Sequence, residues 1–279
     1  MDRPAAGVSR PLALQHPSGS RAEAHAHGAQ VTSFVHPTLG EALFLSRHSR
    51  FGSGMVIRGG IPVVFPQFAA DGPLPRHGLV RTADWQVAEE GEGRTVFRLT
   101  DSEASRGLWP YQWQADLAVE ILDAGALSTA LTITNSGRFG FAFTCALHTY
   151  LRLQDIRRTT LSGLGGIAFR DRLTGAERSE REDVLRVRGP IDRIYLGAPE
   201  RVGIRDGAAR RILTVEKRGF SDLVVWNPWA VAARALTDLD DEEYREFICV
   251  EPANVGRPIF LDGGEQWTGE QIIRVEPEA

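Results

Sequence analysis

Short apolar segments separated by turn residues recur along the chain from about residue 22 onward. In these segments apolar and polar residues alternate, or β-branched and aromatic residues run together, as is typical of β-strands. Clear examples are AQVTSFVH, EALFLS, RTVFRLT, WQADLAVEIL, ALSTALTITN, FAFTCALHTYL, DLVVWNP and EFICVEP. Glycine, asparagine, aspartate and proline fill the intervals, as in GEGR, DAGA and NSGRFG. The pattern predicts many short antiparallel strands.

Helical patterns are scarce, and only residues 230–239 suggest a short helix. Strands and helices do not alternate, and no repeat of fixed period is present. We therefore predict an all-β protein, a large antiparallel β-sandwich that forms one domain over residues 21–279. Residues 1–20 are rich in proline, serine, glycine and alanine, which favours a flexible N-terminal leader.

The overall charge restricts the partners. A formal net charge of −4 disfavours a general nucleic-acid binder, which needs a basic surface. The N-terminus lacks the apolar stretch of a signal peptide, and no later segment is long and apolar enough to span a membrane. We expect a cytoplasmic protein with no nucleic-acid or membrane partner.

Two features with possible metal or redox chemistry have simpler explanations. Cys145 and Cys249 each lie in an apolar run, where cysteine behaves as a small buried hydrophobe, and no C-x-x-C spacing is present. His25 and His27 form an H-x-H pair near the N-terminus, which we do not interpret as a metal site.

The densest polar segment covers residues 57–85, IRGGIPVVFPQFAADGPLPRHGLVRTADW. Arg58 precedes a Gly-Gly pair, which would let the backbone approach a ligand closely. His77 and Arg81 follow at a spacing that suits a loop around an anion. Rigid, glycine-rich polar loops often carry sites, but a proline-rich surface loop with solvated arginines remains the alternative.

Three further polar residues interrupt apolar strands. His148 lies in CALHTYL, Glu251 ends the strand FICVEP, and Asp192 lies in PIDRIYL. A buried carboxylate is costly unless it is paired or functional. Each residue also has a structural explanation: a hydrogen-bonded core histidine, a Glu251–arginine ion pair, and an aspartate at a turn or strand edge.

A family resemblance connects these segments. IRGGIPVVFPQF, DGPLPRHGLVR, LHTYL followed by DI, IDRIYL, VVWNPW and CVEPANV occur in that order over roughly residues 20–275. In this respect the chain resembles the hexose-6-phosphate mutarotase branch of the aldose 1-epimerase superfamily. The resemblance implies a β-supersandwich and an isomerase, glucose-6-phosphate 1-epimerase, that needs no cofactor.

The resemblance also implies roles for individual residues. His148 corresponds to the general acid and Glu251 to the general base. His77 and Asp192 correspond to residues that hold the ring and its hydroxyl groups.

Arg58 and Arg81 correspond to the phosphate contacts of this branch, so a small sugar phosphate is the expected partner.

The chain departs from the usual pattern at Ala69–Ala70, where a glycine is common after FPQF. Four aromatic residues could offer an apolar wall to the sugar, although core packing is their commoner use: Phe65, Phe68, Trp226 and Trp229.

The chemistry implied is the opening of a cyclic hemiacetal. One group takes the proton of the C1 hydroxyl while another protonates the ring oxygen, and we expect a carboxylate and an imidazolium on opposite sides of the sugar. Neither a metal nor a redox cofactor is required. An unphosphorylated aldose 1-epimerase and a non-catalytic carbohydrate-binding sandwich remain as alternatives. The oligomeric state is expected to be a monomer or weak homodimer.

Overall fold

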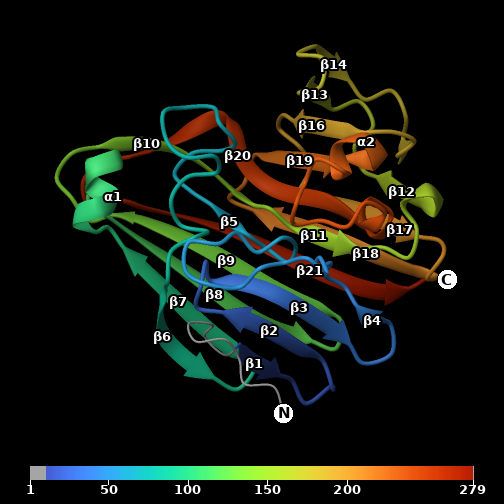
Figure 1. Ribbon diagram of the computed structural model, residues 1–279, viewed down its shortest axis with the longest axis horizontal. Helices are drawn as coiled ribbons and strands as arrows, with labels where there is room; N and C mark the ends of the chain where they lie inside the picture. The colour runs from blue at the N-terminus through green and yellow to red at the C-terminus, as the bar shows by residue number, and fades with distance from the viewer. Residues whose placement is uncertain (1–10, 279) are drawn as a thin grey trace.

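Three antiparallel β-sheets make up the computed structural model, which describes residues 11–278 (Figure 1). The smallest sheet has the strand order β1 (Leu12–Gln15), β2 (Arg21–His25), β3 (Gln30–His36) and β4 (Gly40–Glu41). The predicted all-β fold is therefore confirmed.

The two larger sheets form the body of the sandwich. The nine-stranded sheet has the order β15 (Val184–Arg186), β12 (Thr159–Ser162), β17 (Arg201–Asp206), β18 (Arg211–Arg218), β21 (Gln266–Pro277), β9 (Ala126–Asn135), β8 (Trp113–Asp123), β7 (Arg94–Thr100) and β6 (Gln86–Gly91). The eight-stranded sheet has the order β14 (Glu177–Ser179), β13 (Ala168–Asp171), β16 (Ile191–Tyr195), β19 (Asp222–Asn227), β20 (Phe247–Leu261), β10 (Phe141–Leu147) and β5 (Val63–Val64), and β11 (Tyr150–Arg152) also pairs with β20.

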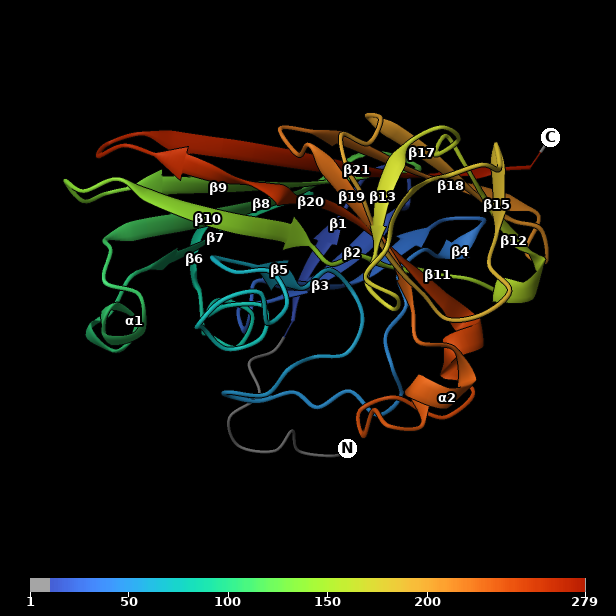
Figure 2. The same cartoon turned by 90° about the horizontal axis from the view of Figure 1, so that it is seen from above.

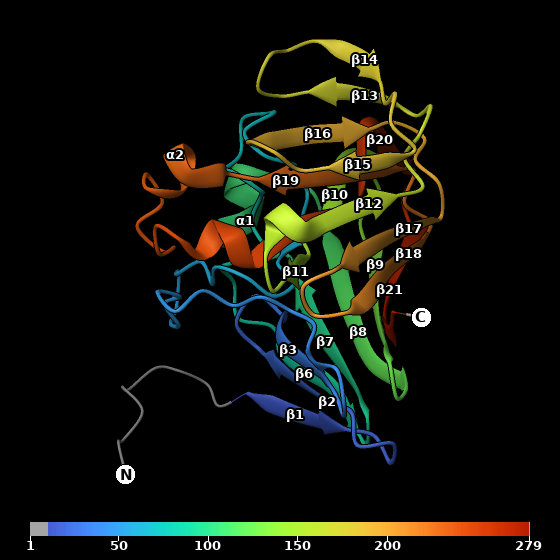
Figure 3. The same cartoon turned by 90° about the vertical axis from the view of Figure 1, so that its right-hand side faces the viewer.

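The alternation in the sequence matches the burial of the strands. In β8, every second side chain from Trp113 to Ile121 is buried, and the residues between them are partly exposed. Successive side chains of a strand point to opposite faces, so one face of β8 packs into the core. Figures 2 and 3 show the strands of the large sheets in layers, with loops and α2 (Trp229–Ala233) on one side.

The N-terminal prediction needs a correction. Residues 12–15, which the composition had assigned to a flexible leader, form β1 and pair with β2 in register. Leu14 is 3% exposed, and Gly19 takes a positive φ of 92° in the connecting turn. The buried side chain of Leu14 and the turn at Gly19 hold residues 12–15 in the sheet, although the composition of this segment is typical of a flexible one. Residues 1–10, also assigned to the leader, lie outside the described residues.

The helices are short. α2 begins near the predicted segment but ends at Ala233, well before residue 239. A second helix, α1 (Glu103–Leu108), was not predicted, although Ser102 and Ser105 form a capping box at its start. The 3-10 helices are η1 (Ile156–Arg158) and η2 (Glu243–Glu246). Within residues 11–278, no helix has the length and apolar character needed to cross a bilayer.

The Gly-Gly pair after Arg58 serves the fold. Gly59 has a φ of 120°, and a Cβ atom there would lie 2.3 Å from the carbonyl oxygen of Phe44. Gly60 has a φ of 62°, and its Cβ would lie 2.0 Å from the carbonyl oxygen of Val31. Only glycine allows the chain to pass so close to these backbones. The pair is therefore explained by packing against neighbouring backbone rather than by the predicted approach to a ligand.

Candidate active site

One cavity of about 420 Å³ brings the predicted residues together. Its walls include all six of them: Arg58, His77, Arg81, His148, Asp192 and Glu251. The residues that line the cavity come from the eight-stranded sheet, from the loop between β5 and β6, and from the α2–η2 segment. Figure 2 shows that this loop and this segment project from the same side of the molecule. A cavity of this size and mixed polarity is suited to a small polar ligand.

The register of the eight-stranded sheet explains why residues distant in sequence meet. Asp192 of β16 lies opposite Trp226 of β19, and Glu251 of β20 lies opposite Val224 of the same strand. Residues 224 and 226 project from one face of β19, so all four side chains share that face. His148 follows β10 directly, and its backbone N–H donates to the carbonyl of Pro62 at 2.9 Å.

His148 and Glu251 lie side by side. The Nδ1 atom of His148 is 3.3 Å from Oε1 of Glu251, and both side chains are almost fully buried. This corrects the expectation that the two groups flank the sugar from opposite sides, because a pyranose does not fit between atoms at this distance. The C1 hydroxyl oxygen and the ring oxygen are bonded to the same carbon, so neighbouring groups are well placed to reach both.

Burial affects the pKa of both residues. It lowers the pKa of His148 well below its ordinary value, and the nearby His77, Arg58 and Arg81 lower it further. Burial raises the pKa of Glu251 well above its ordinary value, which is the direction expected for a better base. These two shifts favour a neutral imidazole beside a carboxylic acid. The alternative form is an imidazolium beside a carboxylate. Both forms hold the same single transferable proton, which belongs to the pair rather than to either residue.

His77 has a fixed tautomer. Its Nδ1 accepts a hydrogen bond from the backbone N–H of Ala69 at 3.3 Å, and burial, followed by the charge of Arg81, lowers its pKa to about 3. The neutral ring therefore carries its proton on Nε2, which is free to donate to a ligand oxygen.

Ala69 has a φ of 48°, a backbone conformation that favours glycine. This conformation explains why a glycine suits the position.

Two arginines mark one end of the cavity. Arg58 donates from Nη1 to the Tyr150 hydroxyl at 2.9 Å and from Nη2 to Oδ2 of Asp238 at 3.1 Å. Tyr150 and the Asp238 carboxylate outweigh burial and raise the pKa of Arg58. Arg81 donates to the carbonyl of Arg76 at 2.8 Å, and burial lowers its pKa to about 10, so it remains charged at neutral pH. These cations suit an anionic group.

A further arginine lies near Asp192 in the same cavity. Arg172 makes two hydrogen bonds to Asp71, at 2.7 and 3.1 Å, and its Nε lies 3.9 Å from Oδ1 of Asp192. Burial raises the pKa of Asp192, while the charge of Arg172 opposes this effect. This end of the cavity therefore offers both hydrogen-bond acceptors and donors.

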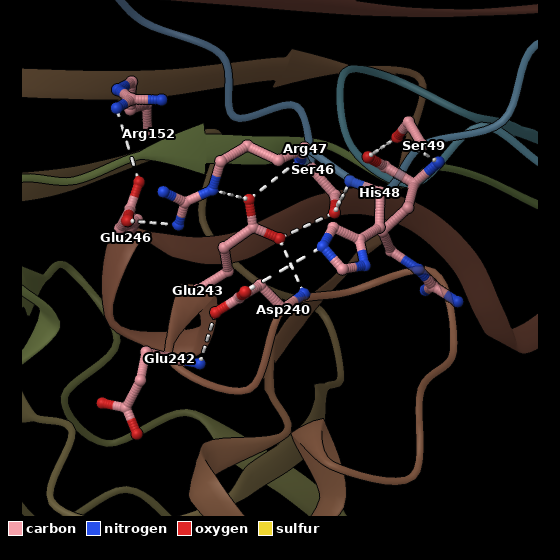
Figure 4. A network of polar contacts seen from close by, with 10 residues as sticks. Ser46, Arg47, His48, Ser49, Arg152, Asp240, Glu242, Glu243 and Glu246 are labelled. Carbon is pink, nitrogen blue, oxygen red and sulfur yellow. Dashed lines mark hydrogen bonds and ion pairs between the residues drawn. The ribbon is translucent and has the colours of Figure 1, made fainter.

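A polar network around Glu243 holds the segment that follows Asp238 in the chain, and Figure 4 shows the contacts of this network. Buried Glu243 accepts hydrogen bonds from the Ser46 hydroxyl, from the backbone N–H and Nε of Arg47, and from the backbone N–H of Asp240, all between 2.7 and 2.9 Å. The N–H of Ser46 in turn donates to the carbonyl of Arg58 at 2.9 Å. The network thus connects the α2–η2 segment to the backbone of Arg58.

Several cavity residues escaped the sequence prediction. Arg76 could have been found because it directly precedes His77, whereas Arg172 and Asp238 lie in polar turns that resemble any exposed loop. Of the four aromatic candidates, Phe68 and Trp226 line the cavity. Phe65 is fully buried and packs against Trp109, Trp113 and Phe143, and Trp229 contacts Tyr244.

The structure also shows the surroundings of the two cysteines and of the H-x-H pair. Cys145 and Cys249 are both free and fully buried, as predicted. Nδ1 of His27 bonds to Asp84 at 2.8 Å, and its Nε2 bonds to the carbonyl of Met55 at 2.7 Å. His25 packs against the ring of Phe51.

Comparison with known proteins identifies relatives that match nearly the whole chain. The family model described as aldose 1-epimerase matches residues 10–274. A protein of Cenchrus ciliaris named "putative glucose-6-phosphate 1-epimerase" is 35% identical, covering 92% of this chain and 82% of its own length. A protein of Escherichia coli K12 with the same name is 31% identical, covering 87% of this chain and 82% of its own length.

Solved structures agree with this assignment. The crystal structure of a "putative mutarotase" from Salmonella typhimurium superposes with a TM-score of 0.88 at 26% identity, covering all of this chain and 96% of that one. The fold, the cavity and the family match lead to the same result. This chain belongs to the aldose 1-epimerase family.

Proposed function

We propose that this protein interconverts the α and β anomers of a hexose 6-phosphate, with His148 and Glu251 as the acid–base pair. The observation that carries the proposal is that this pair and two arginines, Arg58 and Arg81, line one cavity of about 420 Å³. Two relatives are named for glucose 6-phosphate, which supports the same substrate here.

The proton transfers balance without an outside reactant. The reaction starts from the form of the pair in which its one proton is on the imidazole: Glu251 takes the C1 hydroxyl proton, the C1–O5 bond breaks as the carbonyl forms, and His148 gives its proton to O5. After rotation about C1–C2, the acid takes the proton back from the O5 hydroxyl and the ring closes on the other face of the carbonyl. The base then returns its proton to O1. Each group ends in its starting state, and each transfer contributes a factor on the order of 10²–10⁴ in rate.

The charge distribution supports His148 as the group at the ring oxygen. In a hexose 6-phosphate the phosphate is attached through C6 to C5, which also bears the ring oxygen. Arg58 and Arg81 act on the charge of His148, whereas Glu251 is influenced most by Asp192 and then by Arg76 and Arg172, not by Arg58 or Arg81. A phosphate at the arginine end therefore places O5 toward His148 and O1 toward Glu251. Binding energy from the phosphate would then orient the reacting carbon.

Magnetisation-exchange NMR tests the proposal directly. The exchange rate between the two anomers is measured for glucose 6-phosphate and for galactose, with and without the protein. We expect strong acceleration for glucose 6-phosphate and a much smaller effect on galactose. Acceleration of galactose alone would favour the unphosphorylated aldose 1-epimerase, and acceleration of neither sugar would refute the proposed activity.

A further inference from the structure

A third side chain joins His148 and Glu251 beneath the cavity. One ligand atom each from His148, Cys249 and Glu251 lie within 4.8 Å of one another, and all three residues are buried. Cys249 and Glu251 are two residues apart on β20, so they project from the same face of the strand. Cys249 lies opposite Trp226, which lines the cavity, and opposite Tyr150, whose ring stacks on His148.

The cluster matches the ligand chemistry of zinc. Zn²⁺ takes thiolate, imidazole and carboxylate ligands at about 2.0–2.3 Å, and its tetrahedral geometry places neighbouring nitrogen and oxygen ligands ~3.3 Å apart. The His148 and Glu251 ligand atoms are already 3.3 Å apart. The sulfur of Cys249 lies within 4.8 Å of both atoms and would have to move up to about 1.3 Å closer, because tetrahedral zinc holds sulfur and nitrogen or oxygen ligands ~3.5 Å apart. Hard cations such as Mg²⁺ and Ca²⁺ prefer sets of oxygen ligands, so this cluster does not suit them.

Two of the ligand groups have unused bonding capacity. Nδ1 of His148 and Oε2 of Glu251 are buried and lack a hydrogen-bond partner within the part of the chain that the structure describes. Glu251 is only 1% exposed. Buried polar atoms without a partner are rare because desolvation without compensation costs free energy. A cation bound by Nδ1 and by both carboxylate oxygens of Glu251 would satisfy both atoms.

We propose that His148, Cys249 and Glu251 form a binding site for zinc-like divalent cations, and that occupation of this site inhibits the enzyme. When the metal binds, two protons are released to solvent, one from the Cys249 thiol and one from the His148–Glu251 pair, so that the ligands are a thiolate, a neutral imidazole and a carboxylate. The fourth coordination position faces the cavity and takes water. The inhibitory consequence rests on the proposed function, because the metal would engage both members of the acid–base pair.

A binding experiment tests the site without any activity measurement. The full chain is titrated with Zn²⁺ against a chromophoric chelator, and with Co²⁺ while the thiolate-to-cobalt absorption band is followed. We expect one equivalent to bind in the wild type, and Cys249→Ala to weaken binding at least ~10²-fold and abolish the band. Cys145→Ala is the matched control, since Cys145 is equally buried on the neighbouring strand β10.

An inhibition experiment separates the site from the proposed activity. Anomer exchange of glucose 6-phosphate is measured with and without Zn²⁺, and again after addition of a chelator. Wild type and Cys145→Ala should lose activity reversibly, whereas Cys249→Ala should be active and insensitive, because Cys249 does not line the cavity. Equal zinc affinity in Cys249→Ala and wild type, or no binding by wild type, would overturn the site. Zinc binding that leaves exchange unchanged would overturn the inhibition.

Discussion

The Nδ1 atom of His148 lies 3.3 Å from Oε1 of Glu251, in a site where burial disfavours charge on both groups. Neither side chain finds a complete set of hydrogen-bond partners in the described residues. A sugar that brings a hydroxyl group and a ring oxygen to this pair would supply the missing partners. The arrangement therefore favours ligands with two adjacent oxygen atoms on one carbon.

Removal of either group should slow anomer exchange. We expect His148→Asn and Glu251→Gln each to reduce the enzymatic exchange rate of glucose 6-phosphate by at least ~10², because each deletes one proton transfer. Binding of the sugar phosphate, measured by calorimetry, should be largely kept. His16→Asn, which changes a partly exposed histidine outside the cavity, is the control. Full activity in either cavity variant would rule out this acid–base pair.

Loss of Arg58 should affect a phosphorylated sugar selectively. A charge-assisted hydrogen bond contributes about 1.5–3 kcal/mol, so Arg58→Ala should weaken glucose 6-phosphate binding by roughly 10–100-fold. Glucose binding should change far less. Calorimetry with both sugars checks this, with Arg98→Ala as the control because Arg98 is exposed and pairs with Asp116. Equal losses for the two sugars would mean that Arg58 does not contact the phosphate.

Asp238 should compete with the phosphate for Arg58. Its carboxylate accepts a hydrogen bond from Arg58 at 3.1 Å, and it would repel an incoming dianion. Replacement by the isosteric asparagine should tighten the binding of inorganic phosphate by about tenfold, which corresponds to ~1.4 kcal/mol of removed repulsion. Asp241→Asn makes the same change of charge at an exposed position. Weaker phosphate binding in Asp238→Asn would show instead that the carboxylate orients Arg58.

Glu243 should stabilise the fold in a pH-dependent manner. Burial alone would raise its pKa, but hydrogen bonds from the Arg47 N–H, the Ser46 hydroxyl and the Asp240 N–H outweigh it and hold the pKa below the usual value. Because its folded-state pKa is depressed, ionised Glu243 stabilises the fold at pH values above the unfolded-state pKa of glutamate. This stability is lost as the pH falls through the folded-state pKa. Glu243→Gln should therefore lower the free energy of unfolding by about 1–3 kcal/mol at pH 7.

Urea denaturation of the wild type and of Glu243→Gln across a pH series checks this prediction. The difference between the two proteins should be constant near neutrality and should shrink as the pH falls below the usual pKa of glutamate. Glu265→Gln, at an exposed position of the chain, controls for the general effect of removing a carboxylate. A difference that does not depend on pH would assign the loss to packing.

Local patterns determined the class of fold and the candidate chemistry. Alternating residues in strands such as β8 predict a half-buried sheet, because the side-chain period of two is a property of the extended backbone. The motifs around His77, His148 and Glu251 indicated the family and the side chains of the site. The same patterns missed β1 and α1, since short elements have few residues with which to show a period.

Tertiary structure alone decided how the groups of the site are arranged. The register of β16, β19 and β20 places Asp192, Trp226 and Glu251 on one face, and no local pattern encodes that register. For the same reason, the sequence led us to expect His148 and Glu251 on opposite sides of a sugar, whereas they are neighbours. Asp238 contacts Arg58 from a segment that is distant in sequence and that buried Glu243 ties to Ser46. Such contacts depend on long-range packing, which the order of residues within one segment does not reveal.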